Sequence, residues 1–324
     1  MKTIIFPRYG GPDVLEVQER PKPSPTKNQI LVKVHAASAN PLDWHRMRGA
    51  PIFIRFQMGF LAPKENTLGA DLSGVVEAVG EDVTRFQPGD AVYGSIGMGA
   101  FAEYAVSHEK YFSHKPDNIS HGEAASVGVA ALTALQGLRD FGKIDAGKTV
   151  LINGASGGVG TYAVQLAKYY GAEVTGVCST RNVELVRGLG ADTVIDYTKN
   201  DFTKDSKKYD IIFDLAANHN VNSLLGAMNP GAACVVAGYS LPLLLHVGLM
   251  GKRISQKHGV TISTMLAETR QNDLDFLSEL MEKGQMRSAI DQTFPLEQTA
   301  DAIRYLETMR ARGKVVVTIQ SSPN

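Results

Sequence analysis

Residues 149–168 read TVLINGASGGVGTYAVQLAK, and this stretch decides the fold. The branched apolar residues Val150, Leu151 and Ile152 lead into four closely spaced glycines, and apolar residues then recur at helical spacing up to Ala167. The pattern predicts a strand, a tight turn and a helix. Unpaired N–H groups and the dipole at the start of such a helix bind a pyrophosphate, and glycine lets the phosphate approach the backbone. An ordinary turn whose glycines serve only packing is the alternative, and the strands and helices that follow disfavour it.

The residues after this turn alternate between strand and helix patterns. Strand candidates lie at residues 173–178, 193–196, 210–215 and 232–237, with helical segments between them. Such alternation predicts an α/β fold with a doubly wound parallel sheet of the Rossmann type, whose ligands bind at the carboxyl ends of the strands.

The rest of the chain has a different pattern. Short alternating strands at residues 15–19, 30–36, 73–79, 91–93 and 102–106 are separated by glycine-containing turns, which is typical of a small β-barrel. Residues 123–138 predict one helix of small residues. In the last third we expect a helix around residues 274–281, a strand at 290–294, a helix at 299–309 and a strand at 314–319, and we expect this tail to rejoin the first domain. The predicted domains are residues 1–122, completed by residues 266–324, and residues 123–265.

Composition excludes several classes of function. The formal net charge is zero, so no basic surface for nucleic acid or an anionic membrane is expected. The apolar segment 241–250 is about half the length that spans a bilayer, so we predict a buried wall there and no membrane span. The N-terminus carries no secretory signal, and the chain has only two cysteines, which favours the cytoplasm.

The tip of the second predicted strand bears on the choice of coenzyme. An NAD site usually carries Asp or Glu there, but residues 178–182 contain no acid. Ser179, Thr180 and Arg181 instead offer two hydroxyls and a guanidinium, which suit the 2′-phosphate of NADPH. Tyr197 is expected beside the same phosphate or the adenine. The alternatives are a solvated residue at a helix start for Arg181 and an ordinary half-buried tyrosine for Tyr197.

The predicted coenzyme site therefore combines the glycine turn with the carboxyl ends of the strands. Its members are Ala155, Ser156, Gly157, Gly158, Val159, Ser179, Thr180, Arg181, Tyr197, Ala216, Gly238 and Tyr239.

Three motifs together resemble a known family. Residues 69–80 read GADLSGVVEAVG, residues 189–197 read LGADTVIDY behind the glycine turn, and residues 312–317 read RGKVVV. In combination they resemble the medium-chain dehydrogenases/reductases, and among these the zinc-free quinone oxidoreductase-like members. The resemblance implies a GroES-like β-barrel as the N-terminal catalytic domain, a Rossmann domain that binds NADPH, and a homodimer. It also adds Thr133 and Lys314 to the coenzyme site, with helix packing as the alternative for Thr133.

The sequence departs from the zinc-using relatives at their metal ligands. Where those relatives carry a histidine and a glutamate, this sequence has Ala70 and Asp71, and the upstream segment that supplies a cysteine reads Ser38-Ala39-Asn40. One carboxylate cannot hold zinc, which takes a tetrahedral cluster of thiolate, imidazole or carboxylate ligands. Two cysteines are also too few for a structural zinc lobe. We therefore expect no metal.

Without a metal, hydride transfer is easiest to an acceptor with its own electron sink, such as a quinone or an α,β-unsaturated carbonyl. The resemblance places residues 40–43 beside the nicotinamide. We expect Asn40 to donate to the developing oxyanion, Asp43 to hold neighbouring groups and His45 to supply a proton near neutral pH. The alternatives are a turn residue before Pro41 for Asn40, a helix cap for Asp43 and a surface histidine for His45.

The apolar segments 51–61 and 241–250 are expected to form a wall for a flat hydrophobic acceptor, with ordinary core packing as the alternative. The predicted function is thus NADPH-dependent, zinc-independent reduction of quinones or enones by direct hydride transfer. Two other functions stay open, an alcohol or aldehyde oxidoreductase and a regulatory protein that binds NADPH without turnover.

Overall fold

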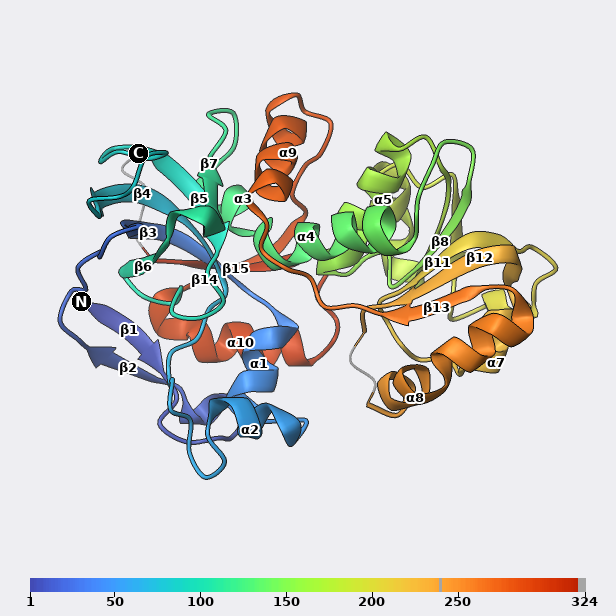
Figure 1. The fold of residues 1–324 in the computed structure, drawn as a ribbon, viewed down its shortest axis with the longest axis horizontal. Helices are drawn as coiled ribbons and strands as arrows, with labels where there is room; N and C mark the ends of the chain where they lie inside the picture. The colour runs from blue at the N-terminus through green and yellow to red at the C-terminus, as the bar shows by residue number, and fades with distance from the viewer. Residues whose placement is uncertain (239–240, 320–324) are drawn as a thin grey trace. The chain divides into compact units, whose positions relative to one another are not determined.

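The computed structural model describes residues 1–238 and 241–319 of the chain. They form two compact units, which are treated separately below (Figure 1). Unit 1 comprises Met1–Ala130 and Thr269–Asn324, so the C-terminal part of the chain returns to the first unit. Unit 2 comprises Ala131–Glu268.

Unit 2 is built on a parallel sheet of six strands in the order β10-β9-β8-β11-β12-β13. The strands are β8 (Thr149–Asn153), β9 (Glu173–Cys178), β10 (Thr193–Asp196), β11 (Tyr209–Asp214), β12 (Met228–Val236) and β13 (Thr261–Thr264). The helices are α5 (Gly158–Tyr169), α6 (Val183–Gly188), α7 (Val221–Gly226) and α8 (Leu241–His258). Because the strand order reverses at β8, α5 covers one face of the sheet while α7 and α8 cover the other (Figure 1). The predicted doubly wound sheet is confirmed.

The glycine turn joins β8 to α5 as the spacing predicts. Gly154 has a φ of +93°, which favours glycine, and it forms the tight turn after the buried strand. A Cβ on Gly160 would lie 2.1 Å from the carbonyl oxygen of Gly154. Gly160 therefore lets the first turn of α5 pack directly on the loop, and this contact fixes where the helix begins.

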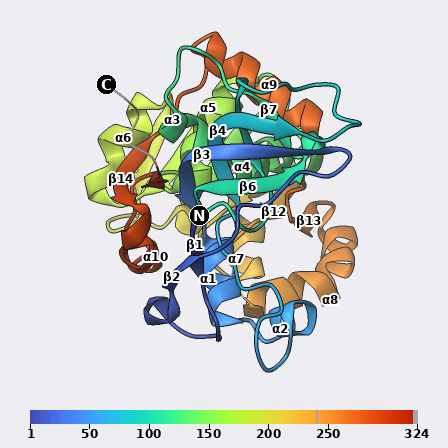
Figure 2. The same ribbon diagram turned by 90° about the vertical axis from the view of Figure 1, so that its left-hand side faces the viewer.

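Unit 1 is built on a curved sheet around the long strand β3 (Gln29–Ala39). One edge of β3 pairs with β4 (Asp71–Val79), while the other edge pairs with β6 (Tyr104–His108) over its first half and with β15 (Lys314–Thr318) over its second. Figure 2 shows β3 between β4 and β6. The remaining strands are β1 (Lys2–Ile5), β2 (Glu16–Glu19), β5 (Ala91–Ser95), β7 (Phe112–His114) and β14 (Ile290–Pro295).

Helices close the core of unit 1. They are α1 (Pro41–Arg48), α2 (Phe53–Met58), α3 (His121–Ala125), α9 (Gln271–Glu282) and α10 (Thr299–Glu307). Helix α10 packs on β3, β14 and β15, and it buries Ala302 and Ile303 against the apolar face of the sheet. The C-terminal segment thus supplies two strands and two helices to unit 1.

The single helix predicted over residues 123–138 is wrong. Helix α3 ends at Ala125, α4 (Gly128–Gln136) begins after a break, and a π-helical turn (Gly137–Phe141) follows. The carboxylate of Asp71 causes the break, because its Oδ1 accepts from the backbone N–H of Val129 at 2.9 Å. A Cβ on Gly128 would lie 2.1 Å from the same oxygen. A distant acid therefore caps the start of a separate helix, which local helix propensity does not reveal.

Segment 241–250 forms the first half of α8, and the predicted buried wall is wrong in part. Leu243 and Val247 are buried, whereas Leu249 is 81 % exposed. Among the helices that the structure describes, α8 included, none is long and apolar enough to cross a bilayer.

Candidate active site

The glycine turn presents the start of α5 at the carboxyl edge of the parallel sheet. Gly157 is the N-cap residue, with extended backbone, and as a glycine it has no side chain to cap the helix. The N–H groups of the first helical turn therefore face outward with the positive end of the helix dipole. Of the predicted coenzyme residues, Ala155 is buried while Ser156, Gly157, Gly158 and Val159 are half-buried along this turn. The turn has the backbone chemistry of an anion site.

A buried network ties the turn to the end of β11. The side-chain amide of Asn153 donates to Asp214 Oδ1 at 2.8 Å and to Asn218 Oδ1 at 2.9 Å. Asp214 Oδ1 also accepts from the backbone N–H of Ala217, which has a φ of +50°. The network fixes the loop that carries Ala216, which is exposed. Sequence patterns alone did not single out these polar residues.

Two further predicted positions, Gly238 and Tyr239, follow β12 in the sequence. Gly238 is buried, and a Cβ there would lie 2.6 Å from the carbonyl oxygen of Leu215, so glycine is required for the close approach of the two loops. Tyr239 lies outside the described residues. Thr133 lies half-buried on α4.

Asn182 links the glycine turn to the tip of β9. Its side-chain amide donates to Ser156 Oγ at 2.9 Å and to Ser179 Oγ at 3.3 Å, and the side chain is buried. The structure therefore brings together Ser156 and Ser179, two residues predicted separately for the coenzyme. Asn182 was missed, because an asparagine at a helix start is ordinarily a cap.

The tip of β9 also holds an acid that the sequence did not reveal. Asp196, the last residue of β10, pairs with Cys178 across the parallel sheet, and its Oδ2 accepts from Thr180 Oγ1 at 2.6 Å. Residues 178–182 carry no acid, but the neighbouring strand places the carboxylate of Asp196 at the same tip. Arg181 and Tyr197 are exposed at the same tip.

Unit 1 contains a buried charge cluster where three strand ends meet. The cross-strand pairing sets Ser38 opposite Asp71 and Ala39 opposite Val315, so Asn40, Asp71 and Lys314 converge. Lys314 Nζ donates to Asn40 Oδ1 at 2.6 Å and lies 3.9 Å from Asp71 Oδ2, with the two charged side chains 3 % and 0 % exposed. Burial lowers the pKa of Lys314 and raises that of Asp71, and their mutual attraction opposes both changes.

This cluster changes the roles expected for Asn40 and Lys314. Both hydrogens of the Asn40 amide are already donated, to Asp71 Oδ2 at 2.9 Å and to the carbonyl of Ser38 at 3.2 Å. Asn40 consequently has no hydrogen left for an oxyanion in this arrangement. The ammonium of Lys314, predicted to bind the coenzyme, lies inside the cluster.

Asp43 is fully buried at the start of α1. Its Oδ2 accepts from the backbone N–H of Asn40 at 2.8 Å and its Oδ1 from that of Gly69 at 3.1 Å. Burial raises the pKa of Asp43 to about 7, although these two hydrogen bonds lower it. The carboxylate joins the N-terminus of α1 to the loop before β4, which matches the capping alternative.

His45 is buried on α1, so the alternative of a surface histidine is wrong. Its Nδ1 lies 2.8 Å from the carbonyl oxygen of Ala50, and its ring stacks on Trp44. Burial lowers the pKa of His45, so the ring is neutral near pH 7 and Nδ1 carries the hydrogen that it donates to Ala50. These observations argue against His45 as a proton donor.

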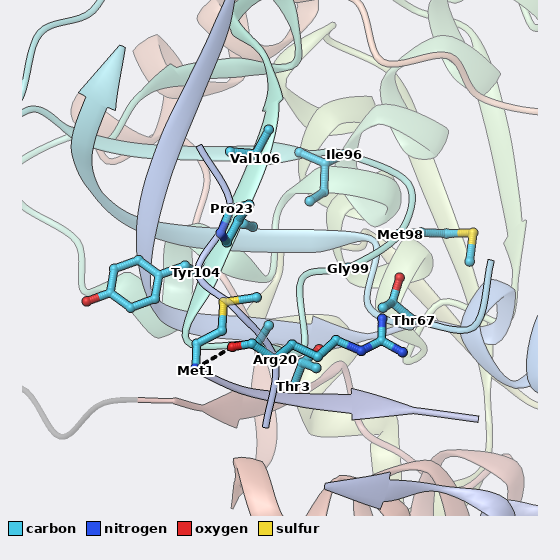
Figure 3. A pocket seen from close by; sticks show the side chains of 12 residues that line it. Met1, Thr3, Arg20, Pro23, Thr67, Ile96, Met98, Gly99, Tyr104 and Val106 are labelled. Atoms are coloured by element: carbon cyan, nitrogen blue, oxygen red, sulfur yellow. Dashed lines mark hydrogen bonds between the residues drawn. The ribbon is translucent and has the colours of Figure 1, made fainter. Parts of the chain in front are cut away.

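The apolar segment 51–61 includes α2 and is largely exposed. Phe56 is 74 % exposed and Leu61 is 91 % exposed, so ordinary core packing is excluded for them. A cavity of about 200 Å³ opens elsewhere on unit 1, beside β1 and β6, and Arg20, Ile96, Met98 and Tyr104 help to line it (Figure 3). None of the predicted site residues that the structure describes lines this cavity.

The described residues contain no group of three His, Cys, Asp or Glu side chains that could hold a metal ion. Ala70 is buried and apolar, and Asp71 is engaged by Val129, Asn40 and Lys314. Asp71 therefore serves as a partner in a buried ion pair, and Ala70 offers no ligand atom for a metal.

Comparison with known proteins agrees with this architecture. The model of the alcohol dehydrogenase GroES-like domain matches residues 26–117, and the model described as zinc-binding dehydrogenase matches residues 189–317. The mitochondrial NAD(P)H oxidoreductase RTN4IP1 of Mus musculus is 35 % identical, with 98 % of this chain and 89 % of that protein covered. The chain belongs to the quinone oxidoreductase-like medium-chain dehydrogenases/reductases.

Two further relatives extend the comparison. The chloroplastic NADPH-dependent alkenal/one oxidoreductase of Arabidopsis thaliana is 34 % identical over 98 % of this chain and 79 % of its own length. The solved quinone oxidoreductase from Coxiella burnetii superposes with a TM-score of 0.87 at 30 % identity, covering 99 % of both chains. This member of the family is an oxidoreductase with a GroES-like N-terminal domain and a Rossmann domain.

Proposed function

We propose that this oxidoreductase uses NADPH to reduce quinones or α,β-unsaturated carbonyls by direct hydride transfer, without zinc. The observation that carries the proposal is near full-length similarity to an NADPH-dependent alkenal/one oxidoreductase and to a quinone oxidoreductase. The residues at the position of the zinc ligands support the absence of zinc, since Ala70 has no side-chain ligand atom and Asp71 pairs with Lys314.

The residues of unit 2 fit a dinucleotide. The uncapped start of α5 would hold the pyrophosphate, and Ser179, Arg181 and Tyr197 would contact the adenosine half. When bound, the nicotinamide supplies the hydride. Gly157 keeps side-chain atoms away from the phosphates, while Asn182 holds the serines on both sides of the site.

The residues of unit 1 orient the acceptor and exclude water. We propose that Asn40, Asp43 and Lys314 position α1, because their polar atoms are engaged within the protein. The exposed apolar side chains of segment 51–61 would cover a flat hydrophobic acceptor. Since His45 is neutral and already donates its Nδ1 hydrogen, the reduced product takes its proton from water.

Three wider features belong to the same proposal. Residues 1–122 with 266–324 form the catalytic domain and residues 123–265 the NADPH-binding domain. The enzyme acts as a homodimer in the cytoplasm. Light scattering of the purified protein tests the dimer, and a monomer would contradict it.

Coenzyme oxidation at 340 nm tests the function. NADPH and NADH are each offered with quinone, enone and saturated aldehyde panels, on protein assayed for bound metal. Turnover with quinones or enones by metal-free protein is the expected result. Turnover confined to alcohols or aldehydes, or one zinc ion per chain, would overturn the proposal.

Gly157→Asp sharpens the test. Aspartate is a favoured N-cap, so α5 should still form, but its charge lies where a pyrophosphate would bind. We expect coenzyme oxidation to be lost with the fold intact. Gly226→Asp, at the end of α7, is the matched control, because a Cβ there meets no atom within 4 Å and the charge change is the same.

A further inference from the structure

The side chain of Asp196 organises the tips of β9 and β10. Asp196 Oδ2 accepts from Thr180 Oγ1 at 2.6 Å, and Oδ1 accepts from Thr198 Oγ1 at 2.7 Å and from the Thr198 backbone N–H at 3.0 Å. These bonds join the loop after β9 to the loop after β10. They stand at the carboxyl edge of the sheet, beside the turn expected to hold a dinucleotide.

The bonds determine which way the hydroxyl hydrogens point. The two hydroxyl oxygens lie 3.0 Å apart, and each hydroxyl has one hydrogen. A carboxylate accepts more strongly than a neutral hydroxyl, so both hydrogens are donated to Asp196 and none is left between the two threonines. The donated hydrogen bonds, first that of Thr180, lower the pKa of Asp196 to about 2, so the carboxylate accepts at any pH near neutral. Thr180 and Thr198 therefore present only lone pairs outward. A lone pair accepts from a ribose hydroxyl and repels a phosphate oxygen.

The negative charge adds to this effect. Lys199 Nζ lies 3.6 Å from Asp196 Oδ2, but that lysine is 67 % exposed and its charge is screened by water. The guanidinium of Arg181 attracts a 2′-phosphate at the same tip, while the carboxylate opposes it. The tip therefore combines a guanidinium, which is typical of NADP sites, with a carboxylate, which is typical of NAD sites.

We propose that Asp196 determines coenzyme specificity, by holding the Thr180 hydroxyl hydrogen away from a 2′-phosphate and so restricting the preference for NADPH over NADH. This inference rests on the proposed function only in requiring the coenzyme to bind at the tip of β9.

Dissociation constants for NADPH and NADH, measured by calorimetry without an acceptor, test the inference. In Asp196→Asn the amide can donate to Thr180 Oγ1, which frees the hydroxyl hydrogen and removes one charge. NADPH should then bind about tenfold more tightly, while the affinity for NADH stays within about twofold. Thr180→Val keeps the charge of Asp196 and has no hydroxyl hydrogen to donate to a phosphate, so the tenfold gain of Asp196→Asn for NADPH should not appear.

Asp192→Asn is the matched control. Asp192 precedes β10 at the amino end of the strands, where its carboxylate accepts from Lys168 Nζ and from the backbone N–H of Val174. The substitution removes the same charge as Asp196→Asn. It should leave the ratio of the two affinities unchanged. An unchanged or reversed ratio in folded Asp196→Asn would overturn the inference while quinone or enone reduction stands. Failure of the wild-type protein to bind either coenzyme would overturn both.

Discussion

Replacing Lys314 by methionine tests the buried charge cluster of unit 1. The substitution keeps the apolar stem but removes the ammonium that lies 2.6 Å from Asn40 Oδ1 and 3.9 Å from Asp71 Oδ2. Asp71 would keep its hydrogen bonds from Asn40 and Val129 but lose its counter-charge in a site with no exposed surface. Leaving one member of a buried ion pair without its partner costs about 3–5 kcal/mol. Unit 1 should be destabilised by this amount at pH 8.

The cost should depend on pH and on Asp71. A buried carboxylate without a counter-charge takes up a proton, so the destabilisation should be smaller at pH 5 than at pH 8. Asp71→Asn removes the unpaired charge. In the double variant with Lys314→Met and Asp71→Asn, the two losses of unfolding free energy should therefore not add, with a coupling of about 1–3 kcal/mol.

Urea unfolding followed by tryptophan fluorescence is a suitable assay. Trp44 is the only tryptophan of the chain, and it lies on α1, directly after Asp43. Its emission therefore reports the unfolding of unit 1. A loss below about 1 kcal/mol for Lys314→Met, or simple additivity in the double variant, would refute the argument that a charged Asp71 depends on Lys314.

Two further predictions follow from buried contacts. Burial raises the pKa of Asp43 to about 7, above its unfolded value, so the folded state binds the proton more tightly and unit 1 should lose roughly 4 kcal/mol of stability between pH 4 and pH 7. Asp43→Asn should remove that part of the slope in the Trp44 assay, and an unaltered slope would contradict the assignment. Gly160→Ala should destabilise unit 2 by about 1–3 kcal/mol in calorimetry, because the new Cβ would lie 2.1 Å from Gly154 O. Gly157→Ala, whose Cβ would lie 3.5 Å from that oxygen, should have a much smaller effect, and equal losses would refute the steric explanation.

Several features of the fold were predictable because they depend on local chemistry. The residues 173–178 and 193–196 form strands at their predicted bounds, since runs of branched apolar residues between polar turns have few other conformations. The helix after the glycine turn followed from apolar spacing in the same way. The exposed and buried faces of segments such as 241–250 were harder to predict, because an apolar run does not indicate which of its side chains pack against other residues.

The site residues that sequence missed are those whose partners are distant along the chain. Asp196 and Asn182 each have ordinary local interpretations, as a strand end and a helix cap. Their partners Thr180 and Ser156 are 16 and 26 residues away along the chain and become visible only in the folded structure. The break between α3 and α4 has the same origin, because the carboxylate that caps α4 comes from Asp71 on β4.

The sequence by itself determined the glycine turn, the alternation of strands and helices that follows it, and the family. The reason is that periodicity and the conformation of a glycine turn depend on residues that are neighbours in the sequence. Only the tertiary structure decided what the polar side chains do. Asn40 and Lys314 are separated by most of the chain, yet the pairing of β15 with β3 brings their polar atoms to 2.6 Å. These are the atoms that the family resemblance assigned to substrate and coenzyme. Hydrogen-bonding capacity is limited for each group, so its function depends on which partners the fold has already supplied.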